Sequence, residues 1–224
     1  MKTTGIRSII LLAVMALSLS AFAGKKEIRF SVSEPDAKIF VDGKMMGVGQ
    51  LQIIIPAYAC VTVKVEKVGF LTGIIEFCNK PDYTPPPKTY YMQLEKDDSY
   101  DASEATDVAN IDIEIKTTKT EVEAWKLLSQ IITSYFDVIE VTDRETGYLR
   151  TAWVAQTFKQ RTVRTRMIVK LGSTDPLTYK IKLVSEYADA ARTSVKNDEL
   201  FKEWDRILRK YKEVIHEIQT RLGS

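Results

Sequence analysis

The sequence predicts two domains, an all-β sandwich at the N-terminal side and an α+β domain at the C-terminal side. Short alternating apolar runs fill residues 24–96 with no long helical period, an acidic stretch occupies residues 97–108, and helical periods appear only in residues 109–224. The length of 224 residues, with 45% hydrophobic and 28% charged residues, is typical of a globular chain with one large or two small domains. We therefore expect a sandwich, an acidic linker and an antiparallel sheet with two helices.

Composition and motifs argue against several classes of function. The chain has 32 Lys and Arg against 30 Asp and Glu, so its formal net charge of +2 gives no electrostatic case for a nucleic-acid partner. Its single His argues against His-rich metal sites and Ser-His-Asp chemistry. The sequence has no nucleophile elbow, phosphate loop, His-Glu-x-x-His or dinucleotide-binding motif. We predict a protein that is not an enzyme and uses no cofactor or metal.

The first 23 residues have the layout of a secretory signal peptide. Lys2 and Arg7 lie in a short basic start, residues 9–19 form an apolar run, and Ala21-Phe22-Ala23 is a small-x-small triplet. The run is shorter than the roughly 20 apolar residues that a membrane span needs, and an uncleaved anchor is the alternative. We expect cleavage near Ala23, an extracytoplasmic location in the periplasm or at the cell surface, and a mature chain without a membrane span.

Alternation and turn residues define the elements of residues 24–96. Asp42-Gly43 predicts a hairpin turn because both residues tolerate the positive φ of a type I′ turn. Pro81 and the run Pro85-Pro86-Pro87 predict a loop, since proline cannot donate to a strand ladder. The expected strands cover residues 28–32, 39–41, 51–55, 60–66, 74–78 and 88–94. A small antiparallel β-sandwich accommodates these strands.

The two cysteines lie in neighbouring predicted strands. If these strands form a hairpin centred on Gly69, Cys60 and Cys78 face each other, because both are nine residues from the centre. A cross-strand disulfide then becomes feasible, an oxidising compartment permits it, and it would stabilise the fold by about 3 kcal/mol. Two free buried thiols are the alternative. Neither cysteine belongs to a Cys-x-x-Cys pair, so redox catalysis and structural zinc are not supported.

Residues 34–44 resemble the opening of a PEGA domain. They read Glu-Pro-Asp-Ala-Lys-Ile-Phe-Val-Asp-Gly-Lys, and members of that family read Pro-x-Gly-Ala, then alternating apolar residues, then Val-Asp-Gly. The alternation of residues 61–65, followed by Gly69-Phe70, is similar to the family strand that ends in Gly-Tyr. This chain departs from the pattern at Asp36, at Gly49-Gln50 in place of Thr-Pro, and at Phe70. The resemblance covers residues 25–95 and implies a small extracytoplasmic β-sandwich without catalytic residues.

Residues 97–108 carry five acidic residues and no basic ones. The stretch is also poor in large apolar residues, so it should not bury enough surface to fold by itself. The sequence therefore predicts a solvated acidic linker here.

Residues 109–224 predict the order β-α-β-β-β-β-α. Thr120 and Glu123 form a capping box that begins the first helix, and a long apolar stripe over residues 197–222 predicts the second, ended by Gly223. The expected strands cover residues 111–115, 136–142, 149–158, 162–171 and 179–187. This order, with Trp125 early in the first helix, is similar to the helix-grip domains of the outer-membrane assembly accessory lipoprotein C. We expect this domain to bind a partner at its sheet–helix cleft or on its outer sheet face.

Two groups of side chains are candidate binding residues. On the strand over residues 162–171, Arg164, Arg166 and Lys170 share one face, and Arg161 lies just before it. These four residues predict a patch for an anionic glycan, peptidoglycan or lipid headgroup. The alternative is the solvated face of a one-sided sheet, paired with nearby carboxylates.

The three tryptophans, Trp125, Trp153 and Trp204, are candidates to line a ligand cleft. The alternative is core packing, since two of the three lie on predicted helix stripes. From these patterns we expect a secreted binding or scaffold protein of the bacterial cell envelope or surface, whose partner is an envelope protein or a cell-surface glycan. An envelope protein-assembly accessory factor and a glycan-processing hydrolase are the alternatives.

Overall fold

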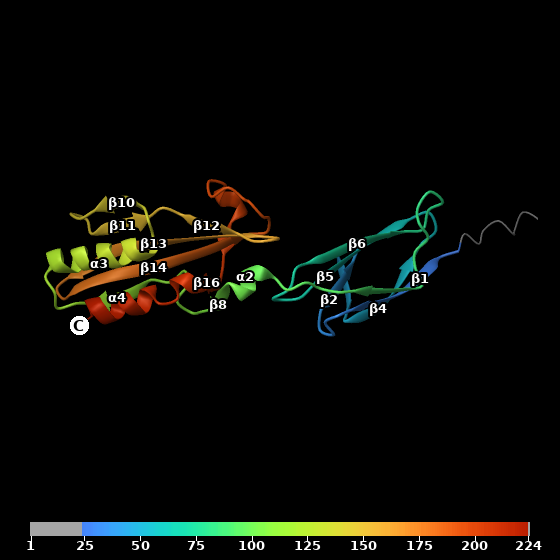
Figure 1. Ribbon diagram of the computed structural model, residues 1–224, viewed down its shortest axis with the longest axis horizontal. Helices are drawn as coiled ribbons and strands as arrows, with labels where there is room; N and C mark the ends of the chain where they lie inside the picture. Colours follow the sequence, from blue (N-terminus) through green and yellow to red (C-terminus); the bar gives the residue numbers. More distant parts are fainter. Residues whose placement is uncertain (1–23, 224) are drawn as a thin grey trace, which may run out of the picture. The chain divides into compact units, whose positions relative to one another are not determined.

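The computed structural model describes residues 24–223, so the predicted signal peptide lies outside the described residues. The chain divides into two compact units, with the boundary between Lys96 and Asp97 (Figure 1). None of the helices within residues 24–223 has the length and apolar character needed to cross a membrane.

The first unit is the predicted β-sandwich. One sheet has the strand order β4-β1-β7 and the other has the order β3-β2-β5-β6. Apart from the parallel pair β1–β7, its ladders are antiparallel. The strand bounds are Lys26–Val32 (β1), Lys38–Val41 (β2), Lys44–Val48 (β3), Gln50–Ile55 (β4), Cys60–Glu66 (β5), Gly73–Cys78 (β6) and Thr89–Met92 (β7). The core is formed by the alternate residues of both sheets, among them Ile28, Phe30 and Val63.

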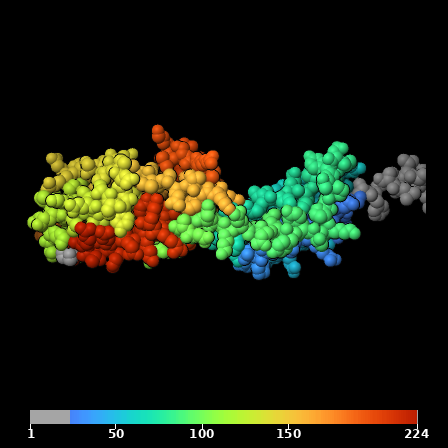
Figure 2. Space-filling view, viewed as in Figure 1, coloured from blue at the N-terminus to red at the C-terminus, as the bar shows by residue number. Residues whose placement is uncertain are grey.

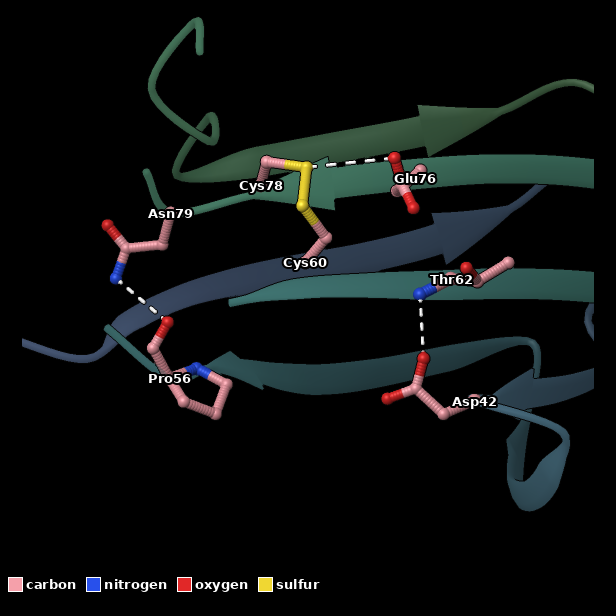
Figure 3. The surroundings of a disulfide bond; sticks show 7 residues. All are labelled: Asp42, Pro56, Cys60, Thr62, Glu76, Cys78 and Asn79. Carbon is pink, nitrogen blue, oxygen red and sulfur yellow. Dashed lines mark hydrogen bonds between the residues drawn. A yellow bond between two sulfur atoms is a disulfide. The ribbon is translucent and has the colours of Figure 1, made fainter. Parts of the chain in front are cut away.

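The structure confirms the predicted hairpin turn and the predicted cysteine pairing. Asp42 and Gly43 both have positive φ, 49° and 81°. Cys60 lies directly opposite Cys78 in the β5–β6 ladder, and the two form a disulfide (Figure 3). Both sulfurs lie within 4.8 Å of a Glu76 oxygen, but bonded sulfurs have no thiolate to offer a metal. The disulfide therefore ties the start of β5 to the end of β6.

The second unit is the predicted α+β domain. Its main sheet has the order β10-β11-β13-β14-β15, with β12 also paired to β13 and β9 also paired to β14. The sheet strands are β9 (Ile113–Lys116), β10 (Ile139–Asp143), β11 (Tyr148–Thr151), β12 (Val154–Thr157), β13 (Thr162–Thr174), β14 (Leu177–Ala188) and β15 (Lys202–Glu203). The other elements are α2 (Asp98–Asp101), β8 (Ser103–Ala105), α3 (Glu121–Tyr135), η2 (Asp198–Leu200), β16 (Arg206–Leu208), η3 (Arg209–Tyr211) and α4 (Val214–Leu222).

Helices α3 and α4 lie side by side over one face of this sheet (Figures 1 and 2). The predicted capping box begins α3: Thr120 accepts a hydrogen bond from the Glu123 backbone, and the Glu123 carboxylate accepts one from the Thr120 backbone. Leu128 of α3, Ile218 of α4 and Val169 of β13 are all buried in the same core. The helices occupy this face, and the segment after β14 covers Arg164 on the opposite face, so the rest of the opposite face is available for contacts with other molecules.

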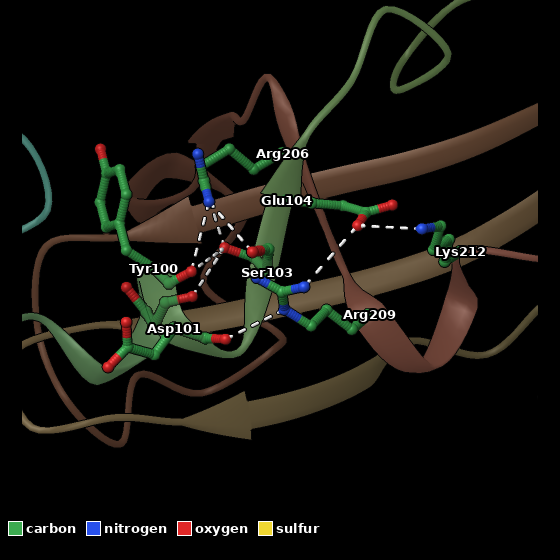
Figure 4. Close-up of polar contacts among 8 residues, drawn as sticks. Tyr100, Asp101, Ser103, Glu104, Arg206, Arg209 and Lys212 are labelled. Carbon is green, nitrogen blue, oxygen red and sulfur yellow. Dashed lines mark hydrogen bonds and ion pairs between the residues drawn. The ribbon is translucent and has the colours of Figure 1, made fainter.

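The prediction of a solvated linker over residues 97–108 is wrong. Asp97 is 1% exposed and caps α2, and β8 pairs with β16 from near the end of the chain. The Arg206 guanidinium donates hydrogen bonds to the Tyr100 and Ser103 backbone oxygens at 3.2 and 3.0 Å (Figure 4). Arg206, more than 100 residues away, thus satisfies backbone carbonyls of this stretch. The local composition of residues 97–108 cannot predict such a distant partner.

The prediction of one long helix over residues 197–222 is also wrong, because only Val214–Leu222 form it. The preceding residues form the short 3-10 turns η2 and η3 and the strands β15 and β16, and several of them bond to distant parts of the chain. Trp204 donates its backbone N–H to Ser185 at 2.9 Å, and the Asn110 side chain donates to the Trp204 carbonyl at 2.9 Å. The predicted strand over residues 149–158 is likewise divided into β11 and β12.

Candidate functional site

The four predicted basic residues do not form one patch. Arg161 lies against the folded acidic segment, where its Nη2 is 3.0 Å from the buried Asp97 carboxylate. The rings of Tyr100, Tyr187 and Trp204 lie 5.2 to 6.0 Å from the guanidinium carbon. This contact neutralises Asp97 and attaches the start of the second unit to the sheet. Arg161 is therefore a structural residue within this unit.

Arg164 is also internal, with 3% of its surface exposed. Its Nε donates to Glu186 at 2.7 Å, and its Nη1 donates to the Asp198 carboxylate and the Val195 carbonyl, each at 2.6 Å. The Phe201 ring lies 3.9 Å from the guanidinium carbon. These contacts attach the segment after β14 to the sheet. Arg164 is not part of an exposed anion-binding patch, because its charge is already paired.

The three predicted cleft tryptophans lie in three different environments. Trp125 packs against Tyr179, with ring centroids 6.3 Å apart, while Trp204 is buried beside Tyr100 at 6.1 Å. Trp153 has its ring centroid 4.0 Å from the guanidinium carbon of Arg166 and 4.1 Å from that of Arg164. The structure therefore does not bring these tryptophans together into a shared cleft.

A different group of cations shares the sheet face opposite the helices. Arg166 and Lys170 point to this face from β13, with Ile168 between them. Ile168 is directly opposite both Arg150 of β11 and Lys182 of β14, and Lys170 is directly opposite Lys180 of β14. We call this surface the basic sheet face, and it consists of Arg150, Arg166, Lys170, Lys180 and Lys182. Arg150, Lys180 and Lys182 were not predicted from the sequence, because only the strand register identifies them as neighbours of Arg166 and Lys170.

The outer cations of the basic sheet face are neutralised by carboxylates at the sheet edges. The Glu140 carboxylate lies 3.1 Å from Arg150, Glu114 lies 3.1 Å from Lys180, and Asp112 lies 3.5 Å from Lys182.

The central cations, Arg166 and Lys170, have no carboxylate partner among residues 24–223. The unpaired positive charge is therefore concentrated on β13.

Arg166 is the more confined of these two cations. It rests on the Trp153 ring, and its Nε is buried without a hydrogen-bond partner. Burial, followed by the positive charge of Arg150, lowers the pKa of the Arg166 guanidinium. An anion bound beside the Arg166 guanidinium would oppose this lowering of the pKa through its negative charge.

Lys170 faces a second cation across the ladder. Like charges directly opposite each other destabilise a pair of strands, and Lys170 and Lys180 are such a pair. Arg166 and Lys170 are four residues apart on one strand, which separates them by roughly 13 Å. This spacing suits a chain with repeated negative charges better than it suits one small ion.

No protein-family model matches the chain, and no curated protein matches it. The PEGA and helix-grip resemblances therefore stay predictions from the sequence. The case for a function depends on the geometry of the basic sheet face.

Proposed function

We propose that this chain is a non-catalytic, extracytoplasmic binding protein of the bacterial cell envelope, and that the basic sheet face of its second unit binds an anionic glycan. One observation carries this proposal: Arg166 and Lys170 lie unpaired at the centre of an open sheet face whose surrounding cations are neutralised. A polyanion would complete the charge pairing of this face.

The proposed location has two supports. The disulfide between Cys60 and Cys78 is of a kind that persists in oxidising compartments and is rare in the cytosol. The first 23 residues have the charge and apolar pattern of a secretory leader. Mass spectrometry of the secreted chain tests the location, and we expect the mature protein to begin near Gly24. A chain that retains residues 1–23 in the cytoplasm would contradict it.

The chemistry of the face favours a glycan with repeated acidic groups. Arginine provides a planar fork of donors for a carboxylate, sulfate or phosphate, and lysine provides a point charge. Ile168, which is partly exposed, offers apolar surface between Arg166 and Lys170, and the C–H face of a sugar ring can lie on it. Because the contacts are exposed charges, binding should weaken as salt shortens the Debye length, which is about 10 Å at 0.1 M.

The test compares binding of the full chain to polygalacturonate, dextran sulfate and neutral dextran. We expect the wild-type chain to bind one or both acidic polymers at low salt and not the neutral one. The double variant Arg166→Gln/Lys170→Gln should lose at least tenfold in affinity. A matched control, Lys126→Gln/Lys210→Gln, removes two exposed lysines from α3 and η3, which are not strands of the sheet, and should bind as the wild type does. The proposal would be overturned if the face variant and the control variant lost equal affinity for the acidic polymers, or if the wild-type chain bound neither acidic polymer.

A second candidate function, an accessory factor in envelope protein assembly, is favoured by the outer face of the four-stranded sheet in the first unit. The register aligns Met45, Phe40, Lys64 and Ile74 in one row across all four strands. Met45 and Ile74 are both exposed, and the Lys64 ammonium lies 4.8 Å from the Phe40 ring centroid. Such a row suits a protein partner. Pull-down from envelope extract with Met45→Ser/Ile74→Ser tests this function, which requires a partner that the variant loses.

A glycan-processing hydrolase would need two carboxyl groups roughly 5 to 10 Å apart around a bound sugar. Incubating the wild-type chain with the same acidic polymers tests this third function. Our proposal predicts binding without any new reducing ends.

A further inference from the structure

The first unit has a hollow of about 390 Å³ beside the disulfide-bonded end of its sandwich. This volume is within the range of small-ligand sites, at its lower end. Two exposed aromatic rings line it, Tyr58 with 69% and Tyr83 with 52% of their surfaces exposed. Large exposed aromatic rings at a hollow are typical of binding sites, because their burial against a ligand releases water from both surfaces.

The backbone of Tyr58 holds an unusual conformation. Its φ is 59°, in the left-handed region, which is an outlier for a bulky aromatic residue without any local reason in its side chain. The conformation is maintained by its backbone N–H, which donates to the Asn79 carbonyl at 2.8 Å. The fold thus maintains a strained turn that places a tyrosine at the rim of the hollow.

Asn79, next to the disulfide, bonds to Pro56 in the turn that carries Tyr58 (Figure 3). The Asn79 amide donates to the Pro56 carbonyl at 3.3 Å and to the Gly24 carbonyl at 3.1 Å. Its backbone N–H donates to the Ala59 carbonyl at 2.8 Å, directly beside the Cys60–Cys78 bond. The turn that carries Tyr58 is therefore held in place before a ligand binds, so little backbone entropy is lost there on binding.

The charge of the hollow is positive. Lys26 and Lys80 line it, and no carboxylate is among its lining residues. The Lys80 ammonium lies 5.6 Å from the Tyr83 ring centroid, so the cation and the ring are adjacent. A ligand for this site needs a flat apolar face for the tyrosines and a negative charge for the lysines.

From this arrangement, we infer that the hollow binds a single acidic sugar residue, with its ring against Tyr58 and Tyr83 and its carboxylate between Lys26 and Lys80. This site lies within the first unit and does not rest on the basic sheet face of the second. The two sites can be tested separately by variants in each unit.

The test is calorimetric titration of the full chain with two matched ligand pairs. Digalacturonate is compared with its dimethyl ester, which masks both carboxylates, and N-acetylmuramic acid is compared with N-acetylglucosamine, which lacks the lactyl group and its carboxylate. We expect the acid of at least one pair to bind at least tenfold more tightly than its neutral partner. The absence of binding by both acids at millimolar concentration, or equal binding within both pairs, would overturn the inference.

Variants then locate the binding. Tyr58→Asn removes the ring but keeps a residue that tolerates positive φ, and Tyr83→Ala removes the second ring. Each of these two variants should lower the affinity for the acidic sugar by at least fivefold. Lys80→Gln should lower the affinity for the acidic sugar and leave the affinity for the neutral sugar unchanged. Tyr91→Ala is the matched control, because Tyr91 is 60% exposed in the same unit but does not line the hollow.

The variants also separate this inference from the proposed function. Arg166→Gln/Lys170→Gln should leave the sugar titration unchanged. Loss of sugar binding in that variant, or in Tyr91→Ala, would contradict the assignment to the hollow. Lys80 is exposed, so Lys80→Gln keeps the test decisive if Tyr58→Asn fails to fold.

Discussion

Removing the disulfide should destabilise the first unit and leave the second unchanged. The change is the double substitution Cys60→Ala/Cys78→Ala, which removes the cross-link without leaving a free thiol. The bond joins residues separated by 18 positions, at the two ends of the β5–β6 hairpin. Its main effect is to restrict the unfolded chain, so the loss should appear as lower stability with the native strands retained.

The expected magnitude follows from the length of the closed loop. For a separation of 18 residues, the loop-entropy relation gives about 3 kcal/mol at 25 °C. For a unit of this size, each 1 kcal/mol changes the melting temperature by about 4 to 8 °C. The variant should therefore melt about 12 to 24 °C lower in the first unit. Reduction of the wild-type chain should have a similar effect.

The distribution of tryptophan separates the two units in the assay. All three tryptophans, Trp125, Trp153 and Trp204, lie in the second unit, so tryptophan fluorescence reports only that unit. Circular dichroism in the far ultraviolet reports both. We expect an early transition by circular dichroism and an unchanged transition by fluorescence. An unchanged melting curve by circular dichroism would refute the loop-entropy reasoning. If the melting temperature measured by fluorescence fell by the same amount, the independence of the two units would be refuted.

Two further predictions concern buried groups in the second unit. Arg164→Met should lower the free energy of unfolding by about 3 kcal/mol, because it leaves Glu186 without its charge partner; urea unfolding followed by tryptophan fluorescence measures this, and a loss below about 1 kcal/mol would contradict it. Burial raises the pKa of Tyr211 to about 12, so the folded state holds that proton more tightly than the unfolded state does. The resulting stability of about 3 kcal/mol is complete below pH 10 and is lost as the pH rises through 12. Unfolding titrations between pH 9 and 12 should show this loss in the wild type, and Tyr211→Phe should reduce it.

The first unit was largely predictable because its signals are local. Asp42-Gly43 specifies a turn through backbone conformation alone. The opposition of Cys60 and Cys78 follows from their equal distance from Gly69, once a hairpin is assumed. The sequence did not predict that β7 pairs with β1 in parallel, since this pairing joins distant segments.

The errors in the second unit arise from long-range contacts. Residues 97–108 look like a linker by composition, but Arg206 and Arg161 bond to them from distant parts of the chain. The apolar residues before Val214 match a helical period, yet Trp204 and its neighbours are buried by pairing to other strands. Local sequence patterns therefore predict that a residue is buried more reliably than they predict whether it lies in a helix or a strand.

The candidate site was predictable only in part. The two-residue period of β13 correctly placed Arg164, Arg166 and Lys170 on one face. It did not reveal that Arg164 is paired with carboxylates 22 and 34 residues away, or that Lys180 is opposite Lys170. Whether a cation is free depends on its neighbours across the sheet, and these are set by register.

The most direct test of the central claim is a nuclear magnetic resonance titration of the full, isotope-labelled chain with galacturonate oligomers. The account predicts that the amides of β13 and β14 and the Nε–H signal of Arg166 shift on binding. In the variant Arg166→Gln/Lys170→Gln these amide shifts should be lost. Shifts confined to α3 and α4, or none in β13 and β14, would contradict the claim that the basic sheet face binds an anionic glycan.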